Sequence, residues 1–110
     1  MTLRRNKFNN IKTEVDGHLF DSKKEAKRYH ELKILQAAGD VWKLQLQPRF
    51  PLWVNGTKVG TYIADFMYER SDGTVVVEDV KSPATKTPVY NLKKKILLTY
   101  NPPVVITEII

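Results

Sequence analysis

The sequence predicts a small α/β domain in which two helices pack on a mixed β-sheet. Helical apolar periodicity recurs over residues 22–38 and 88–100, and strand-like apolar runs lie between and after these segments. The resulting order is helix, three strands, helix, strand, which is typical of helices packed on a sheet. The 110 residues are 42% hydrophobic, enough for one core. We expect a flexible basic arm over residues 1–12 and a single domain over 13–110.

The first helix is predicted from Ser22 to Ala38. Ser22 suits an N-cap, Glu25 follows at the capping-box spacing, and Gly39 provides a stop signal. Glu25 falls within the apolar arc, so its carboxylate is expected to point toward the core and to need a partner or a metal. Just before this helix, residues 13–20 are expected to form a short strand and turn. The arc itself consists of Ala26, Tyr29, Leu32 and Leu35.

Three strands are expected after the first helix, with one further short segment between the first and second. Residues 41–47 alternate, and prolines mark 50–54 as an edge strand or as a continuation after a bend. Asn55-Gly56 is a turn signal. Residues 58–70 and 74–81 are then predicted to be two antiparallel strands. On the first segment, one face carries Trp42, Leu44 and Leu46.

The second helix is predicted to begin after a loop over 82–87. Thr87 suits its N-cap and Pro88 its first position. A final apolar strand is expected over 104–110, and an unprotected strand of this kind is buried or paired with another chain. The predicted apolar face of the helix consists of Val89, Leu92, Ile96 and Tyr100.

The turn between residues 70 and 74 decides how two acids face each other. With Ser71-Asp72-Gly73 as a three-residue loop and Gly73 left-handed, Asp65 lies opposite Asp79. With a two-residue turn, Asp65 faces Val80 instead. We favour the first register, because a protein tolerates two opposed carboxylates best when a cation lies between them.

Asp79 and Lys81 share one face of their strand, since successive residues alternate. Two carboxylates beside an amine can hold a divalent metal and place a cation near a metal-bound water, which suits hydrolysis of a phosphodiester. The competing interpretations are an exposed strand acid at Asp65, a weak surface ion pair of Asp79 with Lys81, and a purely capping Glu25. Glu78 points to the opposite face and is read as structural.

The net charge of +6 and the pI of about 9.6 favour a polyanionic partner, of which nucleic acid is the commonest. The absence of cysteine excludes disulfides and thiolate zinc sites. No apolar run approaches the length of a membrane span, and we expect a cytoplasmic protein with no membrane partner. A solvated helix face is the alternative interpretation of the run Lys93, Lys94 and Lys95.

Four blocks of this chain, in order, resemble the PD-(D/E)xK nuclease superfamily, and more closely a small phage family related to Holliday-junction resolving endonucleases. That superfamily has a restriction-endonuclease-like αβββαβ core, so the resemblance implies a nuclease-like domain over 13–110. Two positions depart from its pattern: Ala64 replaces the name-giving proline, and Ser82 stands where related resolvases often have glycine. The blocks are Phe20–Ala26, Leu46–Phe50, Tyr62–Phe66 and Val77–Ser82.

The resemblance implies a catalytic set of Asp65, Asp79, Lys81 and Glu25. Asp65, Asp79, the carbonyl of Val80 and Glu25 would bind Mg²⁺, with Mn²⁺ as a substitute. The DNA backbone would be held by the cationic side chains of Arg4, Arg5, Lys7, Lys86, Lys93, Lys94 and Lys95.

The leading hypothesis is therefore a Mg²⁺-dependent DNA endonuclease, with branched DNA as a candidate substrate. A homodimer is considered because of the small size, the apolar terminal strand and the resemblance. A phage protein of this kind would act in the host cytoplasm. The alternatives are a catalytically silent nucleic-acid-binding module with the same fold, and an interaction protein whose basic charge is incidental.

Overall fold

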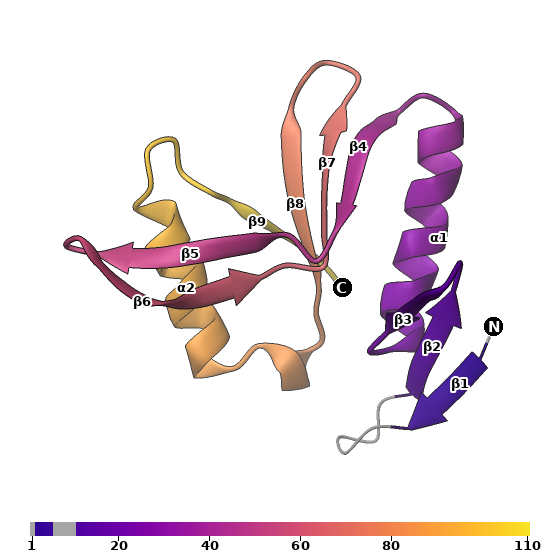
Figure 1. Ribbon diagram of the computed structural model, residues 1–110, viewed down its shortest axis with the longest axis horizontal. Coiled ribbons are helices and arrows are strands. Elements are labelled where there is room, and N and C mark those ends of the chain that lie inside the picture. The colour runs from indigo at the N-terminus through magenta and orange to yellow at the C-terminus, as the bar shows by residue number, and fades with distance from the viewer. Residues whose placement is uncertain (1, 6–10) are drawn as a thin grey trace. The chain divides into compact units, whose positions relative to one another are not determined.

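The computed structural model describes residues 2–5 and 11–110, and Figure 1 shows its elements. The chain forms two compact units, residues 1–41 and 42–110, which are described in turn. Two α-helices and a mixed four-stranded sheet confirm the predicted α/β class. The single domain expected over 13–110 stays a prediction. Neither helix in the described ranges is long and apolar enough to cross a membrane.

The first unit contains a three-stranded antiparallel sheet and the first helix. Its strands are β1 (Thr2–Arg5), β2 (Ile11–Val15) and β3 (His18–Phe20), in the order β1-β2-β3. Part of the segment expected to be a flexible arm is therefore a strand, because β1 pairs with β2. Asp16 and Gly17 have φ angles of 52° and 78°, which confirms the turn predicted between β2 and β3.

Helix α1 (Lys23–Ala37) begins and ends where the sequence predicts. The Ser22 hydroxyl accepts the backbone N–H of Glu25 at 3.1 Å, which caps the first turn. Gly39 has a φ of 84°, a left-handed conformation that glycine adopts without strain. Of the predicted apolar arc, three members are buried and the last is half-buried: Ala26, Tyr29, Leu32 and Leu35.

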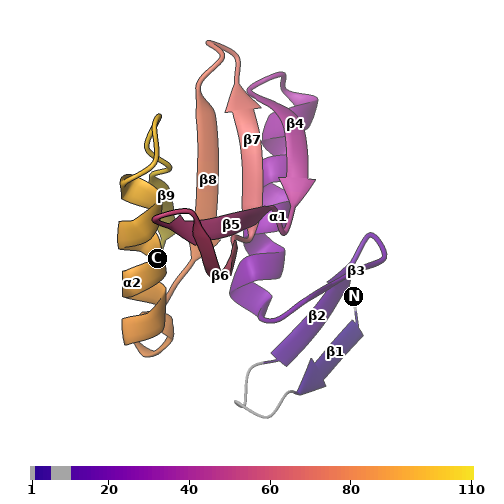
Figure 2. The same ribbon diagram turned by 60° about the vertical axis from the view of Figure 1, so that its left-hand side comes forward.

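The second unit is built on the four-stranded sheet, whose strand order is β4-β7-β8-β9. Strand β8 pairs antiparallel with β7 and parallel with β9. Figure 2 shows β4, β7 and β8 side by side. The predicted alternation of β4 is interrupted, because Lys43 has a φ of 55°. The strands span Val41–Leu46 (β4), Phe66–Arg70 (β7), Val75–Val80 (β8) and Ile106–Ile109 (β9).

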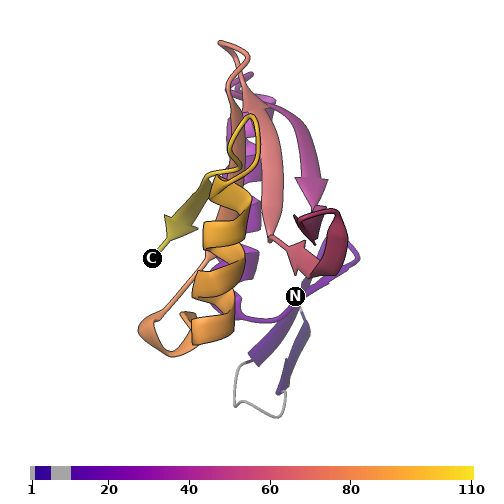
Figure 3. The ribbon, with the colours of Figure 1, turned by 90° about the vertical axis from the view of Figure 1, so that its left-hand side faces the viewer.

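Strands β5 (Arg49–Val54) and β6 (Thr57–Ile63) form a separate hairpin, seen from the side in Figure 3. The prediction of one strand over 58–70 is therefore wrong, because the segment divides into β6 and β7. Ala64 donates its N–H to the carbonyl of Pro48, whereas Asp65 donates its N–H to the carbonyl of Glu78. The backbone thus changes its pairing partner between these two residues.

Helix α2 (Pro88–Leu98) follows a short 3-10 helix, η1 (Pro83–Thr85). Its N-cap is Thr87, as predicted, and its hydroxyl accepts the N–H of Tyr90 at 3.1 Å. The predicted apolar face is right in part: Ile96 and Tyr100 pack against the core, whereas Val89 and Leu92 are 61% and 59% exposed. The buried side chains are Tyr90 and Leu97, so the helix is rotated from the orientation that apolar periodicity suggests.

The core of the second unit lies where α2 meets both sheets. Leu97 is fully buried there, and its position explains the rotation of the helix. Burying one leucine side chain contributes about 1.5–3 kcal/mol. The buried cluster consists of Leu52, Tyr62, Ala64, Val77, Tyr90, Leu97 and Ile106.

We expect Leu97→Ala to lower the free energy of unfolding by about 2–5 kcal/mol, because it leaves a cavity in this core. Leu98→Ala is the matched control, since Leu98 is the next residue and is exposed. It should change stability by about 0.5 kcal/mol or less. Urea denaturation of both variants tests this, and equal losses would contradict the helix orientation.

Candidate active site

The β7–β8 turn fixes the register on which the site depends. Arg70 donates its N–H to the carbonyl of Thr74 at 2.8 Å, and Gly73 donates to the carbonyl of Arg70 at 2.9 Å. Gly73 has a φ of 88°, the left-handed conformation of the three-residue loop. The last pair of the ladder is Phe66 with Glu78. The favoured register is confirmed, and its continuation by one residue, just outside β7, sets Asp65 opposite Asp79.

Asp79 is only 4% exposed, so its carboxylate needs polar partners. The Tyr62 hydroxyl donates a hydrogen bond to Oδ2 of Asp79. The Lys81 Nζ lies 3.5 Å from the same oxygen. Burial, and then the bond to Asp79, raises the pKa of Tyr62 well above its ordinary value, so Tyr62 remains a protonated donor. Strand β6 and the residue that follows β8 thus supply the partners of this carboxylate.

Asp65 lies where the backbone passes from one sheet to the other. Its Oδ2 accepts the backbone N–H of Val80 at 2.7 Å, and its carbonyl accepts the N–H of Gln47 at 2.9 Å. Contacts to two neighbouring segments therefore position the residue. Val80 contacts Asp65 through its backbone amide. A metal-binding role for the Val80 carbonyl stays a prediction.

Lys81 is held between an anion and an aromatic ring. Besides its ion pair with Asp79, its Nζ lies 4.1 Å from the centre of the Tyr90 ring, a cation–π distance. The Tyr90 hydroxyl donates to Oε2 of Glu108 at 2.8 Å. Burial, and then this bond, raises the pKa of Tyr90. The ammonium group of Lys81 is therefore held next to Asp79.

Glu108 is a member of this polar cluster that sequence reasoning missed. It pairs with Asp79 across the parallel β8–β9 ladder, so both lie on one sheet face. The Tyr90 hydroxyl, and then the ammonium groups of Lys94 and Lys86, lowers the pKa of Glu108 to about 2 despite partial burial. An acid within an apolar terminal strand was the available signal, the same signal that singled out Asp65.

The three lysines of α2 have different surroundings. Lys93 donates from Nζ to the carbonyl of Thr61 at 3.0 Å. Lys94 forms an ion pair with Glu108 at 3.2 Å. The side chain of Lys95 is exposed. Lys95 is therefore the best placed of the three to contact a phosphate.

The remaining predicted DNA contacts lie in the loop before α2 and near the N-terminus. Lys86 forms an ion pair with Glu108 at 3.2 Å, yet is itself exposed. Arg4 and Arg5 belong to β1, and Lys7 lies outside the described residues. Their roles stay predictions.

Two further glutamates were singled out from the sequence. Glu25 is 6% exposed, belongs to α1 in the first unit, and donates its backbone N–H to the capping hydroxyl of Ser22. A catalytic or metal-binding role for Glu25 stays a prediction. Glu78, expected to be structural, is buried and accepts a hydrogen bond from the hydroxyl of Tyr68.

The carboxylates of Asp65 and Asp79 are a chemically suitable pair for magnesium. Mg²⁺ prefers oxygen ligands, retains several waters and is commonly bound by one or two carboxylates together with substrate phosphates. In the part of the chain that the structure describes, no group of three or more His, Cys, Asp or Glu side chains is placed to hold a metal. A magnesium site at the two aspartates, completed by water and phosphate, stays a prediction.

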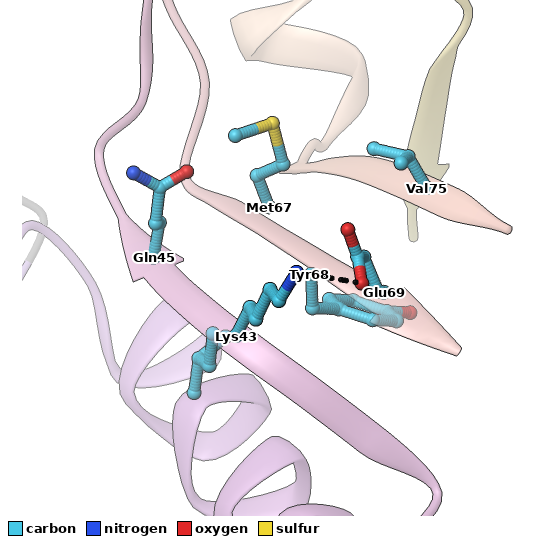
Figure 4. A pocket seen from close by; sticks show the side chains of 7 residues that line it. Lys43, Gln45, Met67, Tyr68, Glu69 and Val75 are labelled. Atoms are coloured by element: carbon cyan, nitrogen blue, oxygen red, sulfur yellow. Dashed lines mark ion pairs between the residues drawn. The ribbon is translucent and has the colours of Figure 1, made fainter. Parts of the chain in front are cut away.

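A hollow of about 430 Å³ lies elsewhere on the sheet, across β4, β7 and β8. Figure 4 shows the ion pair between Lys43 and Glu69, whose Nζ and Oε2 are 3.5 Å apart. None of the predicted site residues lines this hollow. Its lining consists of Lys43, Leu44, Gln45, Met67, Tyr68, Glu69 and Val75.

We expect Glu108→Gln to lower stability by about 1 kcal/mol at pH 7, because the charge that pairs with Lys86 and Lys94 is lost. The native pKa of about 2 lies below the unfolded value, so this stabilisation is complete above about pH 4.5 and is lost as pH falls toward 2. Urea denaturation across this range measures it, with Glu69→Gln as a more exposed control. If the difference in unfolding free energy between the wild type and Glu108→Gln did not change with pH, the lowered pKa of Glu108 would be contradicted.

The chain matches one family of proteins. No curated protein and no solved structure gives a significant match to this chain. A family model described as "Protein of unknown function (DUF1064)" matches residues 5–109, which is nearly the whole sequence. The chain therefore belongs to the DUF1064 family.

Proposed function

We propose that this protein is a Mg²⁺-dependent DNA endonuclease that hydrolyses phosphodiester bonds, with branched DNA as its candidate substrate. The observation that carries the proposal is the β7–β8 register, whose continuation sets Asp65 opposite Asp79, together with the Lys81 Nζ at 3.5 Å from Oδ2 of Asp79. The resemblance of the sequence blocks to PD-(D/E)xK nucleases supports the same function. That resemblance also suggests a phage origin, for which the place of action is the host cytoplasm.

In this proposal Asp65 and Asp79 bind the metal. When bound, Mg²⁺ polarises a phosphate and lowers the pKa of a coordinated water. The Tyr62 hydroxyl and the Val80 amide keep the two carboxylates in place by hydrogen bonds. This fixed arrangement reduces the reorganisation needed when charge develops.

Lys81 supplies the positive charge beside the reacting phosphate. Its Nζ is held by Asp79 and by the ring of Tyr90, which keeps the ammonium group from swinging freely into solvent. From this position it orients a water molecule or stabilises the negative charge that develops in the transition state. Its half-buried side chain strengthens that electrostatic effect.

The basic surface would hold the DNA backbone. The net charge of +6 favours this partner, and Lys95 and Lys86 expose their side chains. A homodimer is part of the proposal, because β9 is an edge strand and Val105 and Ile110 beside it are exposed. Two such sites would suit the two strands that are cut in a branched substrate.

The second candidate is a catalytically silent nucleic-acid-binding module. One observation favours it: Asp79 already has a hydroxyl and an ammonium partner from the protein itself. A carboxylate with such partners can be stable without a metal. In this reading Lys81 serves to neutralise Asp79.

We expect Mg²⁺ or Mn²⁺ to support cutting of a labelled four-way junction, and EDTA to stop it. Lys81→Ala and Asp79→Asn should each lower the cleavage rate by about 10²–10³, because each removes a charge at the reacting centre. Their affinity for DNA should remain. A matched linear duplex shows whether branched DNA is preferred.

Glu69→Gln is the control for the loss of a carboxylate, since Glu69 lies on β7 four residues from Asp65 and should cut normally. Salt-sensitive binding without cutting in any metal would exclude the nuclease and support the silent module. Absence of salt-sensitive DNA binding at low ionic strength would point instead to an interaction protein.

Lys95→Ala should weaken DNA binding and reduce the slope of log Kd against log salt by about 1, as expected for one lost phosphate contact. Lys94→Ala should change that slope less, because Lys94 pairs with Glu108. Fluorescence anisotropy of a labelled duplex at several salt concentrations measures both. Equal slopes in both variants would contradict the view that Lys95 contacts a phosphate and Lys94 does not.

A further inference from the structure

The β5–β6 hairpin has a buried face and an exposed face. Leu52 and Tyr62 belong to the core of the second unit. On the opposite face, Trp53 is 49% exposed and Ile63 is 45% exposed. Large apolar side chains on the open face of a two-stranded ribbon need an explanation, because they gain little stability there.

Side-chain hydrogen bonds from outside the hairpin hold the backbone of both its strands. The Tyr100 hydroxyl donates to the carbonyl of Pro51 and accepts the N–H of Trp53 at 3.0 Å. Lys93 donates to the carbonyl of Thr61 on the other strand at 3.0 Å. Helix α2 and the segment after it therefore fix both strands, so the exposed face is a preformed platform.

The charge of the hairpin has one sign. No acidic residue occurs between Asp40 and Asp65. Arg49 pairs with Ile63, and Lys58 pairs with Trp53 across the ladder. Directly opposed strand residues have Cβ atoms about 5 Å apart. A cation is thus paired with each of two exposed apolar side chains, Ile63 and Trp53, the second pair lying just past an irregularity in the ladder.

We propose that the exposed face of the β5–β6 hairpin binds single-stranded DNA, with a base stacked on Trp53 and phosphates contacted by Lys58 and Arg49. A positively charged surface with an aromatic side chain is the general form of such sites, because every base has a face that can stack. The absence of acids favours a polyanion over a second copy of the chain.

This proposal deepens the nuclease function and rests on it for the link between binding and cutting. Lys58 is five residues from Ile63 along β6, a length of about 17 Å at strand spacing. Ile63 is followed after one residue by Asp65. The hairpin would therefore hold an unpaired strand several nucleotides from the scissile bond, which a branched substrate supplies.

Tryptophan fluorescence tests the contact directly. The chain has two tryptophans, so Trp42→Phe leaves Trp53 as the only one. Oligo(dT) should quench this variant in a salt-sensitive manner. Trp53→Phe is the matched control, because its remaining Trp42 is also exposed, and it should show little quenching.

Affinity provides a second measurement. Trp53→Ala should weaken oligo(dT) binding about tenfold, and Trp42→Ala should leave it unchanged. Thermal unfolding by circular dichroism confirms that both variants remain folded.

Quenching of Trp42 instead of Trp53, or equal quenching of Trp53 by a duplex, would overturn the proposal. A shift of Trp53 emission with protein concentration in the absence of DNA would identify a dimer face and would also overturn it.

Combining these variants with Asp79→Asn separates the two proposals. If Asp79→Asn abolishes cutting while Trp53 is still quenched, both the nuclease and the hairpin site are supported. Quenching without cutting in any metal supports the hairpin site and excludes the nuclease. Metal-dependent cutting with no response of Trp53 excludes the hairpin site and leaves the nuclease in place.

Discussion

The buried carboxylate of Asp79 imposes the constraint that the rest of the second unit satisfies. An ionised carboxylate inside a protein is stable only with close polar partners, and removal of one partner leaves an uncompensated charge. Here the partners come from different parts of the chain, since Tyr62 lies on β6 and Lys81 directly follows β8. The hairpin and the sheet must therefore dock in one way for Asp79 to be accommodated.

The placement of Asp65 and Asp79 could be predicted from sequence because it depends on local chemistry. Gly73 adopts the left-handed conformation of a three-residue loop, and Asp72 accepts the N–H of Thr74 at 2.9 Å. Once the turn is fixed, the two-residue period of a strand determines which side chains share a face. The caps of α1 and α2 were predictable for the same reason, since each is a bond within one turn of helix.

Three features could not be predicted, because each depends on tertiary contacts. The strand over 58–70 divides at Asp65, where the chain exchanges β5 for β8 as its partner. Helix α2 turns Leu97 inward because the core lies on that side, although apolar spacing favoured Leu92. Glu108 lies beside Asp79 because β8 pairs in parallel with β9, and these two strands are far apart in sequence.

The same contacts change how the basic charge of the chain should be understood. Lys86 and Lys94 face Glu108, and Tyr90 connects Glu108 to Lys81. These cations neutralise acids of the folded unit, so not all of the 18 lysines and arginines are available to a polyanion. The cations on the exposed face of the β5–β6 hairpin stand in a stretch without acids, so this face is better suited to a nucleic-acid contact than the lysine run of α2.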